Sequence, residues 1–140
     1  MNTSRTIEQL EADPWPATPS DASPMVARCY SLRKVPLEQL SAGDCRMLLA
    51  QEIGTKYVVP LALAFVEADP LLEGDYYPGD LLHTLFDVED QYWVNHEEHR
   101  FQLVKVAQEA GKSLGERSNG SGSEKKLLKE INGFLTRATA

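Results

Sequence analysis

The sequence predicts an all-α protein, a compact multi-helix bundle that forms one domain over residues 1–140. Three observations support this fold class: apolar residues recur every three or four positions, several such segments begin with helix-capping residues, and no run alternates apolar and polar residues between hairpin turns. The length of 140 residues, with 42% hydrophobic and 25% charged residues, fits a single globular domain. We expect a proline-rich N-terminal arm and a C-terminal amphipathic helix after a flexible linker.

The N-terminal region predicts a short helix, an arm and a second helix. Thr6 and Gln9 have the spacing of a capping box that opens a short helix. Residues 13–24 contain four prolines among Ser, Thr and Asp, which excludes regular helix and indicates an extended arm. We expect Trp15 to pin this arm to the core, because a large amphipathic ring gains most from burial. Apolar spacing then predicts a helix over 25–34.

Two apolar helices are predicted in the middle of the chain. Ser41 has the position of an N-cap before the apolar residues of segment 45–53, and Gly54 stands where a left-handed C-terminal cap is expected. The next helix, over 58–68, is almost continuously apolar and is therefore expected to be central. Pro60 is placed in its first turn, where a proline is tolerated.

The C-terminal half predicts three more helices. Asp80 is expected to cap a helix of Leu and Phe residues, and segment 89–110 is expected to form one long helix that stops at Gly111. Residues 112–123 have the composition of a flexible linker, and Ser123 is the expected cap of the final helix. The apolar face of that helix contains Leu127, Leu128, Ile131, Phe134 and Leu135.

Charge is distributed unevenly along the chain. The net charge of −7 argues against nucleic acid as a direct partner, because binding to phosphates depends on Lys and Arg. Ten acidic residues and one basic residue, Arg100, lie in the acidic band, residues 61–100, which carries −9 while the remainder carries +2. Such a band either steers a basic partner or is a solvated helix surface.

Aromatic residues accompany the acidic residues of this band. Tyr and Trp are enriched at protein interfaces, but they also cover hydrophobic cores at helix ends. If the band binds a partner, the candidate partner-binding residues are Glu73, Asp75, Asp80, Asp87, Glu89, Asp90, Tyr92, Trp93, Glu97 and Glu98.

No pattern indicates catalysis, a metal or a cofactor. His96 and His99 are three residues apart and could share one helix face, but zinc proteases space two His by four residues, and only the distant His83 could complete a site. No glycine-rich phosphate-binding loop or nucleophile motif is present. Cys29 and Cys45 have no metal-binding spacing and are expected to be reduced, buried thiols. The sequence therefore predicts a protein that is not an enzyme.

Export and membrane insertion are not predicted. The N-terminus lacks the apolar core of a secretory signal, and the longest apolar run, 57–66, is ten residues, whereas a bilayer-spanning helix needs about 20. We therefore expect a cytoplasmic protein.

Five segments, in order, resemble the immunity proteins of bacterial contact-dependent growth inhibition systems. They are Thr6-Ile-Glu-Gln-Leu-Glu with Trp15, Leu32-Arg33 with Pro36-Leu37, Leu48 to Gly54, Tyr57-Val-Val-Pro-Leu-Ala-Leu63, and Glu73-Gly-Asp-Tyr-Tyr-Pro-Gly-Asp-Leu-Leu82. The resemblance implies an all-α protein that binds and neutralises the C-terminal toxin domain of a cognate effector, without cofactor or catalysis, and so protects the producing cell. Such toxins are often nucleases, whose basic surfaces would complement the acidic band. The resemblance fixes neither the toxin's activity nor the contact residues.

Two alternatives to an immunity protein remain open at this point. One is a small metal-dependent or acid/base enzyme that uses His96, His99 and neighbouring carboxylates. The other is a helical adaptor that associates through the terminal amphipathic helix.

Overall fold

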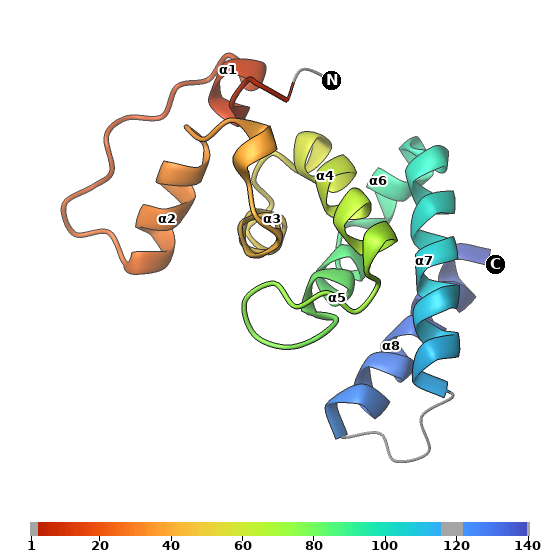
Figure 1. Ribbon diagram of the computed structural model, residues 1–140. Coiled ribbons are helices and arrows are strands. Elements are labelled where there is room, and N and C mark those ends of the chain that lie inside the picture. The colour runs from red at the N-terminus through yellow and green to blue at the C-terminus, as the bar shows by residue number, and fades with distance from the viewer. Residues whose placement is uncertain (1–2, 116–121, 140) are drawn as a thin grey trace.

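A computed structural model of the chain describes residues 3–115 and 122–139, and this described part consists of helices and loops without strands (Figure 1). The predicted all-α fold is confirmed. In chain order the elements are α1 (Ile7–Glu11), α2 (Pro24–Leu32), the short 3₁₀ helix η1 (Leu37–Gln39), α3 (Ala42–Ala50), α4 (Thr55–Ala68), α5 (Asp80–Phe86), α6 (Asp90–Asn95), α7 (Glu97–Gly115) and α8 (Gly122–Thr139).

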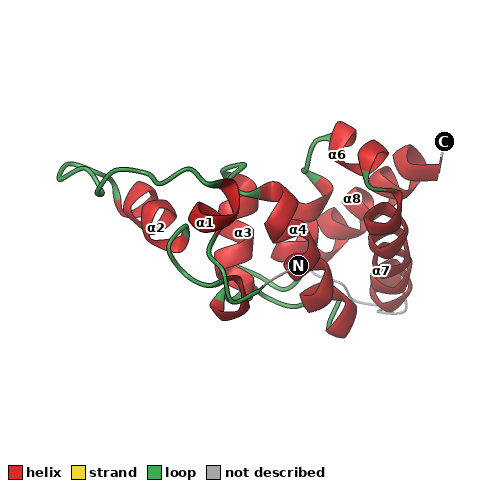
Figure 2. Ribbon diagram, turned by 90° about the horizontal axis from the view of Figure 1, so that it is seen from above, coloured by secondary structure: helices red, strands yellow, loops and turns green. Residues whose placement is uncertain are grey.

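The central helices α3, α4 and α5 pack on one another, and the other helices flank them on two sides. The long helices α7 and α8 lie against each other and cover α4 and α5, respectively (Figure 1). Helix α2 and the extended arm lie at the opposite end of the molecule, where α2 contacts α3; Figure 2 shows the arm as a long loop at this end. One hydrophobic core runs through the bundle, from Ile7 in α1 to Phe134 in α8.

Local capping fixes the start of three helices, and the sequence predicts the first two of these caps. The Thr6 hydroxyl accepts the backbone N–H of Gln9, and the Gln9 side chain accepts the N–H of Thr6, which completes the capping box of α1. Ser41 and Asp44 form the same arrangement at α3. Helix α2 is capped by Ser23 and begins at Pro24, where a missing N–H costs nothing.

The arm is anchored at its start by Trp15. The ring of Trp15 contacts Tyr30 edge-on, with centroids 4.9 Å apart, and the guanidinium of Arg33 lies 4.2 Å from the Trp15 ring centroid. Arg33 is 1% exposed and donates to the carboxylate of Glu11 at 2.7 Å and to the carbonyl of Asp13 at 2.9 Å. Trp15 therefore holds the arm against α2, as expected for a large ring in a proline-rich segment.

The amphipathic face of α8 docks as predicted. Leu127, Ile131 and Phe134 are buried, and the Phe134 ring stacks on Phe86 of α5 with centroids 4.8 Å apart. Fully burying such a side chain contributes about 1.5–3 kcal/mol, so this face holds α8 against the bundle.

Two predictions around α4 are wrong in detail. Gly54 does adopt the left-handed conformation (φ 60°), but as the N-cap of α4; α3 ends at Ala50 with Gln51 as its C-cap, and Glu52 takes a positive φ of 58° after it. A side chain at Gly54 would also meet Ile7, because a Cβ there would lie 2.9 Å from an Ile7 methyl. Helix α4 begins three residues earlier than predicted, so Pro60 lies in its second turn, where it cannot donate to the carbonyl four residues before it.

The predicted long helix over 89–110 is divided at His96. His96 has φ −134° and ψ 69°, outside the helical region, and it separates α6 from α7. Its Nδ1 donates to the carbonyl of Tyr92 at 2.8 Å. A continuous helix would pair that carbonyl with the backbone N–H of His96, so the side chain competes with the helix and the helix ends there.

The boundaries of the predicted linker are also wrong. Helix α7 continues past Gly111 to Gly115, and α8 begins at Gly122, so Ser123 lies within the helix and is not its cap. Gly111 faces α8, because a Cβ there would lie 3.4 Å from Ile131. The remainder of the predicted linker, 116–121, lies outside the described residues.

Candidate interaction surface

The predicted partner-binding residues fall into three places in the structure. The first is the loop between α4 and α5 with the first residue of α5, the second is the turn between α5 and α6 with the first residue of α6, and the third runs from α6 into the start of α7. In that order they contain Glu73, Asp75 and Asp80; then Asp87, Glu89 and Asp90; then Tyr92, Trp93, Glu97 and Glu98.

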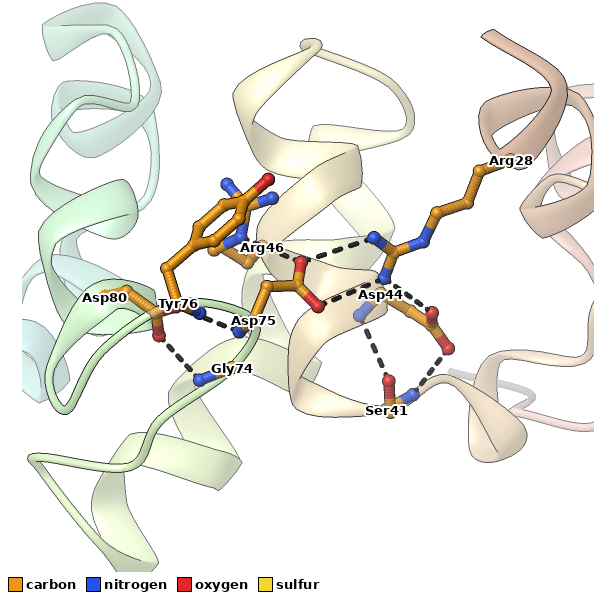
Figure 3. A network of polar contacts seen from close by, with 8 residues as sticks. All are labelled: Arg28, Ser41, Asp44, Arg46, Gly74, Asp75, Tyr76 and Asp80. Atoms are coloured by element: carbon orange, nitrogen blue, oxygen red, sulfur yellow. Dashed lines mark hydrogen bonds and ion pairs between the residues drawn. The ribbon is translucent and has the colours of Figure 1, made fainter. Parts of the chain in front are cut away.

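The buried side chain of Asp80 holds the loop before α5 in place through hydrogen bonds to its backbone. Its carboxylate is 2% exposed and accepts backbone N–H groups from Gly74 at 2.6 Å, Asp75 at 2.9 Å and Tyr76 at 2.8 Å (Figure 3). Burial alone would raise the pKa of Asp80, but these N–H donors outweigh it and hold the pKa below its ordinary value of 3.8. The prediction that Asp80 caps α5 is wrong: Gly79 is the N-cap, and Asp80 instead organises the preceding loop.

Asp75 joins this loop to two other helices through arginines. Its carboxylate lies 3.3 Å from Arg28 Nη1 of α2 and 3.0 Å from Arg46 Nε of α3 (Figure 3). Arg28 also pairs with Asp44 at 3.1 Å. Burial opposes ionisation of Asp44, yet its hydrogen bonds with Ser41 and Arg28 lower its pKa. The charge of Asp75 is therefore neutralised within the fold, whereas Glu73 is exposed.

The two tyrosines of the loop have different environments. Tyr76 is 68% exposed, and the guanidinium of Arg46 lies 4.6 Å from its ring centroid. The Tyr77 hydroxyl lies 2.7 Å from His83 Nδ1, and Nε2 of His83 lies 3.2 Å from Glu130 on α8. Burial, with the nearby acidic residues, raises the pKa of Tyr77. Tyr77 thus ties the loop to α5 and α8, while Tyr76 faces the surface.

A groove of about 540 Å³ opens between α3, this loop and the turn after α5. We call it the Tyr76 groove; its polar and aromatic lining includes Arg46, Glu52, Tyr76, His83, Asp87 and Glu89. Asp87 is exposed, with a contact of 3.5 Å to His83, and Glu89 and Glu52 are exposed as well. The turn residues Asp87 and Glu89 therefore form part of an open acidic surface.

The predicted aromatic residues of α6 lie in the core. Tyr92 is 7% exposed and Trp93 is 4% exposed; their rings meet edge-on at 5.2 Å, and Trp93 also contacts Phe134 at 6.4 Å. Burial raises the pKa of Tyr92 to about 12. These two rings cover the core between α6 and α8, so they lie beneath the surface that their acidic neighbours form.

The two histidines at the junction of α6 and α7 do not converge on one point. Their rings are parallel within 1° and stack with centroids 5.5 Å apart, and each Nδ1 contacts Tyr92: that of His96 its carbonyl, that of His99 its hydroxyl. Two ligand nitrogens must each come within about 2.1 Å of a zinc ion, which parallel rings at this separation do not achieve. Over residues 3–115 and 122–139, no group of three or more His, Cys, Asp or Glu side chains is placed to hold a metal.

A second hollow, of about 330 Å³, lies between α6, α7 and α8. Asp90, Val94 and Glu97 line it together with the buried rings of Trp93 and Phe134. Val94 is 66% exposed, and Phe101, farther along α7, is 63% exposed. Glu98 and Glu97 belong to a neighbouring shallow depression beside the two histidines. Glu89 lines the first groove and Asp90 the second hollow, so exposed carboxylates lie at both, although Arg100 and Arg137 also line the second hollow.

Sequence analysis missed three residues of this surface as candidates. Arg46 and Glu52 lie outside the acidic band, and only the folded chain brings them beside Tyr76. Val94 is an apolar residue exposed on α6. The break at His96 changes which positions of the two helices face the core, so a single helical period could not separate exposed from buried apolar residues.

The chain belongs to the family of CDI immunity proteins, where CDI denotes contact-dependent growth inhibition, because the model of that family matches residues 9–103, more than half of the chain. The match includes all ten candidate residues and both hollows' acidic residues, and it extends beyond the segments that carried the resemblance in the sequence. No curated protein and no solved structure matches the chain. None of the helices in the described ranges has the length and apolarity that crossing a membrane requires.

Proposed function

We propose that this protein binds the C-terminal toxin domain of a cognate contact-dependent effector and neutralises it by forming a stoichiometric complex in the cytoplasm of the producing cell. The observation that carries this proposal is the family match over residues 9–103. Members of this family are generally not enzymes, so inhibition is proposed to come from binding alone. No cofactor is required for such a mechanism.

The acidic surface supports a basic toxin domain as the partner. Asp87, Glu89 and Asp90 lie on the turn between the two hollows, and Glu97 and Glu98 continue the surface at the start of α7. An acidic surface accelerates encounter with a basic one, and exposed apolar residues such as Val94 add contact area. We propose that the toxin presents a basic surface of the kind that nucleases use to hold nucleic acid.

Growth protection and direct binding together test this function. The toxin domain of the effector encoded beside this gene is induced in a susceptible strain with or without the chain, and the purified pair is examined by size-exclusion chromatography and calorimetry. We expect restored growth and a one-to-one complex. A toxin domain from an unrelated effector is the specificity control. Protection without any complex, or a complex without protection, would contradict neutralisation by binding.

A further inference from the structure

We propose that the Tyr76 groove receives an arginine side chain of the toxin domain, stacked on Tyr76 and paired with Glu52 and Glu89. This inference rests on the proposed function and goes beyond it, because it assigns one contact and the chemistry of its partner. It is argued from the position of Tyr76, from the charges that the fold leaves unpaired, and from the shape of the groove.

Tyr76 is an exposed ring that the fold holds in place. With 68% of its surface accessible, it is the most exposed of the large apolar and aromatic side chains among the described residues. Its backbone N–H is bonded to the buried Asp80 carboxylate, and the Arg46 guanidinium covers part of its ring. A ring that is already ordered loses little conformational freedom when a partner docks, which is typical of the aromatic residues that dominate binding energy.

The groove is negative because its one arginine is already neutralised. Arg46 donates from Nε to Asp75 at 3.0 Å, and its side chain is only 11% exposed. Glu52 and Glu89, in contrast, form no ion pair or side-chain hydrogen bond with any residue of the described part of the chain. A cationic side chain that entered the groove would therefore meet the free carboxylates of Glu52 and Glu89, while the charge of Arg46 is offset by Asp75.

Arginine fits this environment better than lysine. A planar guanidinium stacks on an aromatic ring and offers five N–H donors, so it can lie on Tyr76 and still bond two carboxylates. A lysine ammonium is a compact, strongly hydrated charge that makes poorer use of the ring. The groove volume of about 540 Å³ is ample for one such side chain, and the apolar residues Leu49 and Val88 in its lining suit the aliphatic stem.

Matched variants separate a contact in the groove from the general effect of charge. Glu52→Gln with Glu89→Gln removes two negative charges from the groove, and Asp21→Asn with Glu109→Gln removes two from exposed positions elsewhere. Binding to the purified cognate toxin domain is measured by surface-based kinetics, with circular dichroism confirming that each variant is folded. We expect the groove pair to weaken binding about tenfold or more, mainly through faster dissociation, and the control pair by less than about twofold.

Aromatic variants test the stacking part of the proposal. Tyr76→Ala should weaken binding about tenfold or more, whereas Tyr76→Phe keeps the ring and should bind nearly as wild type. Phe101→Ala, which truncates another exposed ring outside the groove, is the matched control and should have little effect. Each toxin arginine is then changed to Gln or to Lys. One of them should lose its effect in the Glu52→Gln/Glu89→Gln background, as expected of a direct partner.

Several outcomes would overturn the inference. If groove and control variants bind alike, or if no toxin arginine couples to the groove, the arginine contact does not exist while the proposed function stands. The same follows if Phe101→Ala weakens binding and Tyr76→Ala does not, because the contact then lies on α7. If the wild-type chain fails to bind the toxin domain, the proposed function and this inference both fail.

Discussion

The loop before α5 and the segment from Asp87 to Glu98 are both acidic, but the fold uses their carboxylates differently. In the loop, Asp80 is buried against three backbone N–H groups and Asp75 is paired with two arginines. In the later segment the carboxylates are exposed, and their one ion-pair contact with the described residues is a 3.5 Å approach of Asp87 to His83. Net charge alone does not distinguish these roles; the partners of each carboxylate do.

This difference separates stability from binding. A buried carboxylate that accepts several hydrogen bonds holds backbone in place, and its removal leaves donors unsatisfied. An exposed carboxylate contributes little to folding but adds to the electric field that a partner meets during encounter. We therefore expect substitution of the loop carboxylates Asp75 and Asp80 to destabilise the fold, and substitutions in the later segment to alter association with the toxin.

The largest effect is expected from Asp80→Ala. The substitution leaves the N–H groups of Gly74, Asp75 and Tyr76 without their acceptor, which should lower the free energy of unfolding by about 3 kcal/mol. Urea denaturation followed by circular dichroism measures the change. Asp87→Ala, in the exposed turn, is the control and should leave the denaturation midpoint unchanged. Equal midpoints for the two variants would remove the distinction between the regions.

The stability that Asp80 contributes should depend on pH, which gives an independent check of its hydrogen bonds. Because its pKa in the folded protein is below the ordinary value of 3.8, ionised Asp80 stabilises the fold above that pH, and this contribution is lost as pH falls through the lowered pKa. The stability difference between wild type and Asp80→Asn should therefore be constant near neutral pH and shrink below about pH 4. A difference that grows on acidification would contradict the assigned hydrogen bonds.

A smaller loss of stability is expected from Gly43→Ala in α3. Gly43 is buried against the loop, and a Cβ at this position would overlap Oδ1 of Asp75. The Asp75 side chain would have to move and weaken its contacts with Arg28 and Arg46, so we expect a loss of about 1–3 kcal/mol. Gly115→Ala, where a Cβ meets nothing within 4 Å, is the matched control.

The size of this effect depends on Asp75, which a double variant can test. Asp75→Ala removes the overlapping oxygen, so Gly43→Ala should cost less in that background than in the wild type. Urea denaturation of the wild type, the two single variants and the double variant gives the coupling free energy between the two substitutions. Strict additivity would show that Gly43 is needed for a reason other than its contact with Asp75.

Short-range features of the fold were predictable from the sequence, and features that depend on contacts across the chain were not. The caps at Thr6 and Ser41 involve side chains and backbone three residues apart, so the local pattern suffices. The break at His96 also has a local cause, but a hydrogen bond from its ring competes with an otherwise good helical period. The role of Asp80 depends on how the loop folds back onto this residue, and the spacing of apolar residues in the sequence does not indicate that.

The same limit applies to the candidate surface. The acidic band placed Asp87, Glu89 and Asp90 correctly on the exterior, because charged residues without partners remain in water. Tyr92 and Trp93 were candidates for partner binding because of their residue types alone, yet the orientation of α6 buries both. Tyr76 belongs by composition to the same group of aromatic residues beside the acidic ones, but only the structure shows that Arg46 lies over its ring and that Glu52 lines the same groove.

The smallest effect on stability, and the largest on encounter, is expected when Asp87, Glu89 and Asp90 are changed together to Lys. All three are exposed, so the denaturation midpoint should stay near that of wild type, whereas association with a basic toxin domain should slow and lose most of its salt dependence. The Debye length is about 8 Å at physiological ionic strength, so the difference from wild type should be clear at low salt and small at high salt.

A control triple with the same change in net charge decides between a local and a global field. Asp21, Glu38 and Glu109 are exposed in other parts of the molecule, and changing all three to Lys alters the net charge equally. Stopped-flow association with the cognate toxin domain is measured for both triples at low and high salt. If the turn forms part of the docking surface, its triple should slow association more than the control triple, because charges within a Debye length of the partner act most strongly. Equal slowing would mean that the toxin responds only to overall charge, and the acidic turn would then be a solvated surface with no more part in binding than the rest of the exterior.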